Sequence, residues 1–149
     1  MRRSKIVMAC WVVAAVFFGS CDRSPEGKLA KHVKRGDEYV KEEKFKEAVI
    51  EYKNAVKAVP KDSAAHWKLA KASIEAKDIR TAFAELQKTV ELDPSNFDAA
   101  IRLGLLFETH GRIDDACRWL EQAVSLRPDS REAARYLEMT RARSQQAPT

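Results

Sequence analysis

Hydrophobic and small residues recur along the chain at the spacing of amphipathic helices. Between residues 97 and 130, a first apolar face is followed by a second, and charged residues occupy the intervening positions. The two faces consist of Ala100, Leu103, Gly104 and Phe107, and of Ile113, Ala116, Leu120 and Ala123. This pattern predicts two helices joined by a turn around Gly111, a residue suited to a left-handed helix end.

The same pattern recurs with a period of 34 residues. Pro60, Pro94 and Pro128 lie one period apart. Other slots repeat with them: Gly36, Ala70 and Gly104; Ala48, Ala82 and Ala116; Tyr52, Leu86 and Leu120; Ala55, Thr89 and Ala123. A period of this length predicts a stack of identical structural units. We therefore expect three helical hairpins, over residues 29–62, 63–96 and 97–130.

The repeated slots also predict how each hairpin closes. Small residues in the Gly36 and Ala48 slots allow two helices to approach closely, whereas a bulky side chain would separate them. Each proline ends a second helix, and Asp62, Asn96 and Ser130 follow two residues later as expected N-caps.

The segment after the third hairpin keeps the register but changes in composition. Ala134 and Leu137 occupy apolar slots, while charged residues fill most other positions of 131–143. A stack of repeats needs a polar helix at its open end. We expect a capping helix over 131–143 and a frayed tail over 144–149.

These residues resemble the tetratricopeptide repeat (TPR) over about residues 29–130. The sequence departs from the family pattern at six positions. They are His32, His66 and Ala100 in the Trp slot, Arg35 in the Leu slot, Ser73 in the aromatic slot and Thr89 in the last Ala slot. The resemblance implies an all-α fold, namely a right-handed α-solenoid of three TPR hairpins plus a C-terminal capping helix. It also implies a protein-binding function.

In TPR arrays the first helix of each unit lines a concave groove, and the matching positions here combine apolar with basic side chains. That combination suits an acidic or amphipathic segment of a protein partner. The alternative is a solvated face whose apolar residues pack against neighbouring helices. The positions are Val33, Lys34, Asp37, Val40, Lys41, Trp67, Lys68, Lys71, Ile74, Glu75, Ile101, Arg102, Leu105, Glu108 and Thr109.

Two of these positions argue against one subclass of the family. Family members that bind chaperone tails have Lys and Asn where this chain has Val33 and Asp37. We therefore do not expect a chaperone-tail receptor.

The first twenty residues have the three parts of an export signal: basic Met1–Lys5, an apolar run from Ile6 to Phe18, and the small pair Gly19-Ser20. The alternative is a transmembrane anchor, but a spanning helix needs roughly 20 residues. The run is shorter than that.

Phe18-Gly-Ser-Cys21 resembles the lipobox of bacterial lipoproteins, which implies cleavage before Cys21 and acylation of that residue. The alternative is an ordinary cleavable signal that leaves Cys21 as a free thiol. Residues 21–28 are expected to form a short tether to the repeats. The resemblance implies a lipid-anchored protein of the bacterial cell envelope that faces the periplasm. Asp22 favours anchoring in the inner membrane, and the outer membrane is the alternative location.

The remaining composition indicates a binding module without chemistry of its own. The formal net charge of +5 falls to about +2 without the signal, too little to indicate nucleic-acid binding. The sequence contains no metal-binding or nucleotide-binding motif. His32 and His66 share one repeat slot and are expected to be packing or flanking residues. Cys117 has no expected disulfide partner. We expect no enzyme activity, cofactor or metal.

Together these features predict a membrane-anchored protein–protein interaction scaffold in an envelope assembly or export system, such as polysaccharide export, pilus or secretion machinery, or outer-membrane assembly. The alternative is a non-catalytic accessory subunit of an envelope enzyme, such as a peptidoglycan or polysaccharide synthase. The partner and the oligomeric state stay open.

Overall fold

The computed structural model describes residues 24–146, and all regular structure in that range is helical. The helices are α1 (Pro25–Lys41), α2 (Phe45–Ala58), α3 (Ser63–Glu75), α4 (Ile79–Leu92), α5 (Phe97–Thr109), α6 (Ile113–Leu126) and α7 (Arg131–Gln146).

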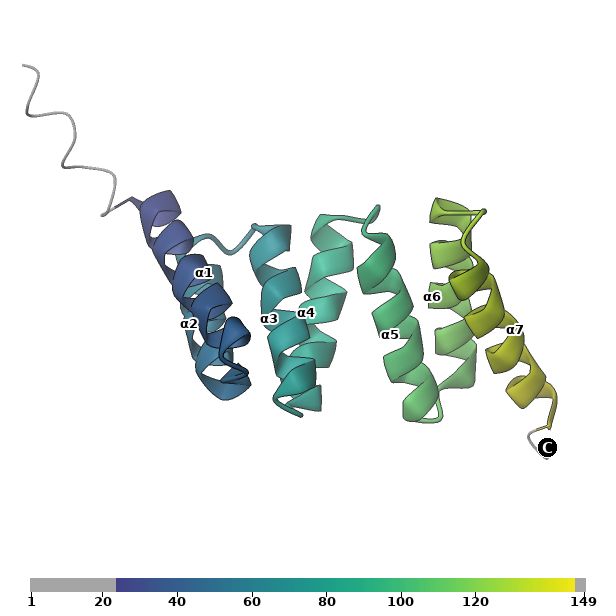
Figure 1. Cartoon of the computed structure of the whole chain (residues 1–149). Coiled ribbons are helices and arrows are strands. Elements are labelled where there is room, and N and C mark those ends of the chain that lie inside the picture. The colour runs from purple at the N-terminus through teal and green to yellow at the C-terminus, as the bar shows by residue number, and fades with distance from the viewer. Residues whose placement is uncertain (1–23, 147–149) are drawn as a thin grey trace, which may run out of the picture.

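The helix pairs follow one another in chain order, so the fold is an elongated row of hairpins (Figure 1). The helices pair as the antiparallel hairpins α1/α2, α3/α4 and α5/α6, and α7 packs against the last pair. Contacts are made almost entirely between neighbours in the sequence, as in repeat arrays. The predicted all-α solenoid of three hairpins and a capping helix is confirmed.

Helix starts are set by side-chain caps. The carboxylate of Asp62, the amide oxygen of Asn96 and the hydroxyl of Ser130 accept hydrogen bonds from the third backbone N–H beyond them, at 2.7, 3.0 and 3.2 Å. Such caps satisfy N–H groups that have no partner within the helix. The three predicted N-caps are confirmed, and Ser24 and Asp78 cap α1 and α4 in the same way.

The turn within each hairpin uses one left-handed residue at the same repeat position. These residues are Glu43 (φ 56°), Lys77 (φ 61°) and Gly111 (φ 72°). The left-handed helix end expected at Gly111 is confirmed. Only the third turn has a glycine at this position, so the first two hairpins carry a conformational cost of about 1 kcal/mol each.

The core follows the repeat period. Leu69, Leu86, Leu103 and Leu120 are fully buried, and so are the alanines of the small-residue slots. A side chain added at Gly104 would meet Leu120 at 2.8 Å, which explains the small residue at this crossing.

The ends of the array differ from the sequence expectation. Helix α1 already begins at Pro25, because Ser24 caps it and proline suits the first helical turn. The expected tether over 21–28 is therefore helical from residue 25 onward. Helix α7 extends to Gln146, three residues beyond the expected end.

The predicted signal over 1–20, Cys21 and Asp22 lie outside the described residues, as do residues 147–149. Within residues 24–146, no helix has the length and hydropathy needed to cross a bilayer.

Candidate protein-binding groove

A pocket of about 690 Å³ opens along the first helices of the three hairpins. Most of its wall comes from α1 and α3, with one side chain from α5 and two residues from α2. The lining residues are Asp37, Val40, Lys41, Glu43, Phe45, Tyr52, Lys68, Lys71, Ala72, Glu75 and Arg102.

Asp37 joins three helices in the wall of this pocket. Its Oδ1 accepts a hydrogen bond of 2.6 Å from the Tyr52 hydroxyl on α2 and another of 2.6 Å from Lys68 Nζ on α3. Tyr52 is buried, and its ring lies against Gly36, where any side chain would overlap it. The bare backbone at Gly36 therefore lets the phenol pass between α1 and α2 to reach the groove.

These contacts shift the protonation equilibria of both partners. Burial acts to raise the pKa of Asp37, but hydrogen bonds from Lys68 and Tyr52 and the charges of Lys68 and Lys41 outweigh it, so this pKa lies below its ordinary value. Burial, the hydrogen bond to Asp37 and its negative charge all raise the pKa of Tyr52. Asp37 is thus a fixed negative charge and Tyr52 a neutral donor near neutral pH.

Two further cations are held by the half-buried indole of Trp67. Lys71 Nζ lies 5.2 Å from the ring centroid, and the Arg102 guanidinium of the next hairpin lies 5.7 Å from it. Within residues 24–146, neither forms an ion pair with a carboxylate. Cation–π contacts orient such groups without cancelling their charge. This side of the groove is therefore positive and open to an anionic group.

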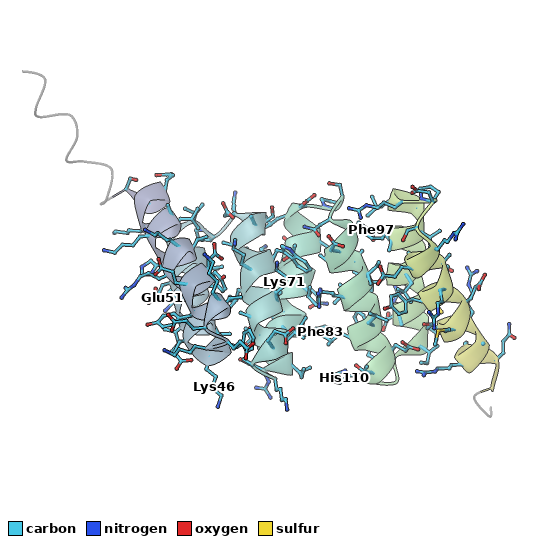
Figure 2. All side chains as sticks on the ribbon, viewed as in Figure 1. Lys46, Glu51, Lys71, Phe83, Phe97 and His110 are labelled. Atoms are coloured by element: carbon cyan, nitrogen blue, oxygen red, sulfur yellow. The ribbon has the colours of Figure 1, made fainter. Side chains whose placement is uncertain are left out.

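Figure 2 shows where this region lies in the array. Lys71 is at mid-height, whereas Lys46 and His110 lie at one long edge and Phe97 at the opposite edge. The pocket thus extends from mid-height, at Lys71, to the turn between α1 and α2, where Glu43 and Phe45 line it.

The structure brings part of the predicted set together in the pocket. The predicted positions in its wall are Asp37, Val40, Lys41, Lys68, Lys71, Glu75 and Arg102. Trp67 is not itself in the wall, but its ring contacts two of these residues, Lys71 and Arg102. Val33 and Ile74 are half-buried, and Lys34 is exposed outside the pocket.

On the third hairpin only Arg102 lies in the pocket wall, and three other predicted positions lie against α7. Ile101 is only 7% exposed and packs with Ala133 of α7, and Leu105 packs against the same cluster. Glu108 pairs with Arg143 of α7 at 2.8 Å. The capping helix lies over this face, so these residues bind α7 instead of lining the groove.

Thr109 also lies outside the pocket, where its hydroxyl donates to the Leu106 carbonyl.

Sequence reasoning missed four residues of the wall: Glu43, Phe45, Tyr52 and Ala72. Tyr52 left a readable signal, because the same slot holds Leu86 and Leu120 in the other repeats. A tyrosine in a buried leucine slot needs a partner for its hydroxyl, and that partner must lie near the surface.

His32 and His66 each contact a glutamate on the second helix of their own hairpin. His66 is buried; its Nδ1 lies 2.5 Å from Glu85 Oε2 and its Nε2 lies 3.0 Å from the Pro60 carbonyl oxygen. His32 makes the corresponding contact with Glu51 at 2.7 Å. In the described range, no three His, Cys, Asp or Glu residues are grouped so that they could hold a metal ion.

Family models identify the repeats. A model described as TPR repeat matches residues 36–73, and one described as Tetratricopeptide repeat matches residues 73–139.

Among curated proteins, sperm-associated antigen 1 of Rattus norvegicus is 30% identical over 107 residues, covering 69% of this chain and 12% of that protein. The mouse protein is 26% identical over 103 residues, covering 69% of this chain and 11% of its own length. The chain thus spans only about an eighth of these relatives.

Solved structures share the fold. The second TPR domain of human RPAP3, in complex with the HSP70 peptide SGPTIEEVD, matches with a TM-score of 0.72 and 21% identity over 79% of this chain and 98% of that one. The first TPR of Spaghetti (RPAP3), bound to the HSP90 peptide SRMEEVD, matches with a TM-score of 0.72 and 22% identity. The match covers 80% of this chain and 94% of that one. YrrB, a TPR protein with an unusual peptide-binding site, matches with a TM-score of 0.71 and 21% identity. The match covers 78% of this chain and 60% of that one.

Proposed function

The chain belongs to the tetratricopeptide-repeat family and is a protein–protein interaction domain, and on that premise we propose that its groove binds an acidic or amphipathic segment of a partner protein. The observation that carries the proposal is the pair of cations at Lys71 and Arg102, which share one indole and have no carboxylate partner within residues 24–146. Apolar surface lies in the same pocket at Val40 and Phe45. A segment with a carboxylate beside an apolar side chain complements both features.

Structural relatives support a peptide ligand, since two of them carry bound acidic peptides. This chain differs from a receptor for such tails because a carboxylate, Asp37, already occupies Lys68. The proposal is therefore a partner other than a chaperone tail.

We also propose that the array is held at a bacterial membrane by a lipid on Cys21 and serves an envelope assembly or export system, facing the periplasm. The support is the lipobox-like Phe18-Gly-Ser-Cys21 and the short connection. Only residues 22–24 separate Cys21 from the first residue of α1, so the array begins within about 14 Å of the acylated residue. Such a short reach favours a partner segment close to the bilayer.

The anchor is tested by mass spectrometry of the mature amino terminus. The expected product begins at Cys21 and carries acyl chains, which extraction with detergent leaves attached. An unmodified Cys21, or a mature chain that retains residues 1–20, contradicts the anchor.

The groove is tested by reversing its charge. Lys71→Glu together with Arg102→Glu is expected to remove the partner recovered by crosslinking in intact cells, while Lys46→Glu, at the edge of the array, leaves recovery unchanged (Figure 2). Unchanged recovery with the double variant contradicts the groove as the binding site.

The composition of the crosslinked complex separates the two candidate roles. A multiprotein assembly supports a scaffold in an assembly or export system. A single enzyme in fixed proportion supports the alternative of a non-catalytic accessory subunit.

A further inference from the structure

The groove contains basic groups in two different states. Lys68 Nζ is bonded to Asp37 Oδ1 at 2.6 Å, so a carboxylate of the chain itself neutralises its charge. Lys71 and Arg102 stand on Trp67 without an acidic partner in the described part of the chain. Lys68 is thus already paired with a carboxylate of the chain itself, whereas Lys71 and Arg102 are not.

The repeat register shows the same difference in charge at one slot. Asp37 occupies the slot that Lys71 occupies one repeat later, and α7 covers Leu105, the third residue of that slot. The groove therefore changes sign between the first and second hairpins. A ligand that lies along it meets a fixed negative charge on α1 and a free positive charge on α3.

We propose that the groove selects a segment with one isolated carboxylate beside an apolar side chain, and that Asp37 is the specificity residue that rejects segments with several adjacent carboxylates. This inference rests on the proposed function of the groove as a peptide-binding site. It names the class of ligand that the site accepts.

Rejection follows from the contacts of Asp37. A ligand carboxylate that approached Lys68 would have to compete with Asp37 for the ammonium and would lie beside a second negative charge. Asp37 cannot turn aside freely, because the buried Tyr52 also donates 2.6 Å to its Oδ1. Like charges brought together at an interface are costly, and these would be screened only in part.

Acceptance follows from the contacts of Lys71 and Arg102. Lys71 and Arg102 contact one ring from successive hairpins, so a ligand carboxylate that reaches either of them meets a cation without an acidic partner in the described residues. Val40, Phe45 and Ala72 line the same pocket and offer apolar surface to an apolar side chain of the ligand. A ligand with one acid and one apolar neighbour uses both surfaces and avoids Asp37.

The test compares two peptides on the full chain purified in a non-ionic detergent. SRMEEVD supplies adjacent carboxylates, and SRMQEVN with an amidated end keeps the methionine and a single glutamate. Asp37→Asn is expected to tighten binding of SRMEEVD by about fivefold or more and to change binding of the single-carboxylate peptide by less than about twofold, because only the first places a second carboxylate near residue 37. Isothermal titration calorimetry measures both.

Asp129→Asn is the matched control, because it removes the same charge from the exposed turn before α7. It is expected to change neither affinity, whereas an equal gain for SRMEEVD would assign the effect to net charge and overturn the inference. An Asp37→Asn protein that gains nothing for SRMEEVD, or gains equally for both peptides, also overturns it.

Lys71→Glu distinguishes this failure from failure of the proposed function. One distinguishing result is that Lys71→Glu removes binding of the single-carboxylate peptide while Asp37→Asn has no effect on either affinity. That result supports the groove as the binding site and contradicts only the proposed role of Asp37 in selectivity. If no form of the protein binds either peptide, or Lys71→Glu leaves both affinities unchanged, the groove and the inference fail together. Circular dichroism confirms that each variant keeps its helices.

Discussion

The hydroxyl of Tyr52 donates a 2.6 Å hydrogen bond to the carboxylate of Asp37 and so connects the core of the first hairpin to its binding surface. The ring belongs to the core cluster formed with Ala48 and Leu69, while the carboxylate faces the pocket. A change in the packing of α2 is therefore expected to alter the position of the Asp37 carboxylate in the groove.

Tyr52→Phe removes this hydrogen bond but keeps the ring in the core. We expect a loss of about 1 kcal/mol in the free energy of unfolding, the usual net value of one hydrogen bond. Urea denaturation followed by circular dichroism measures it. Tyr39→Phe is the control, because the Tyr39 hydroxyl makes no hydrogen bond within residues 24–146. Equal losses for the two variants would contradict a specific role for the bond to Asp37.

The pKa of Asp37 predicts how its contribution depends on pH. This pKa is lower in the folded protein than the ordinary value of 3.8, so the charged form is favoured by folding. Its stabilisation is then fully present above pH 3.8 and is lost as the pH falls through the lower folded value. The difference in unfolding free energy between the wild-type protein and Asp37→Asn should stay constant from about pH 7 to about pH 5 and shrink below pH 4. A difference that grows on acidification would contradict the assignment.

His66→Ala should destabilise the second hairpin. The imidazole bonds to Glu85 and to the Pro60 carbonyl and is only 6% exposed, so its removal leaves two acceptors without a donor. We expect a loss of about 2 kcal/mol in the free energy of unfolding, measured by urea denaturation.

His32→Ala provides the matched control one repeat earlier. Its partner Glu51 retains Arg35 at 3.6 Å, and the His32 side chain is 25% exposed. The expected loss is below about 1 kcal/mol. A larger effect at His32 than at His66 would contradict this ranking.

Ser73→Ala should leave the protein as stable as before or make it more stable by up to about 1 kcal/mol. The Ser73 hydroxyl is fully buried and has no hydrogen-bond partner within residues 24–146, so it retains a desolvation cost that alanine lacks. Thermal and urea denaturation test this. Ser125→Ala, at an exposed hydroxyl, should change the unfolding free energy by less than about 0.5 kcal/mol. A clear loss at Ser73 would show that its hydroxyl has a stabilising partner.

The fold could be predicted because its information is local and repeated. Proline, small-residue and N-cap slots recur at one period, and each acts on its own turn or crossing. Asp62, Asn96 and Gly111 therefore behave in the structure as their chemistry predicts.

The groove could be predicted only in part, because it depends on contacts between units. The repeat register predicts which residues share one face of a helix. It does not show which neighbouring helix covers that face. Helix α7 covers Ile101, and Trp67 faces the cations that it supports. The link from Asp37 to Lys68 joins residues 31 positions apart on different hairpins, and no motif encodes it.

Site-specific photocrosslinking tests the central claim, that this groove is the partner site, most directly. A photoreactive residue at Val40, in the pocket wall, is compared with one at Ile50, which is 60% exposed on α2 and outside the pocket. We predict that only the Val40 probe captures the partner, at a segment that contains an acidic residue, and that Lys71→Glu abolishes the capture. Capture from Ile50 instead, or capture from Val40 that Lys71→Glu leaves unchanged, would contradict the account.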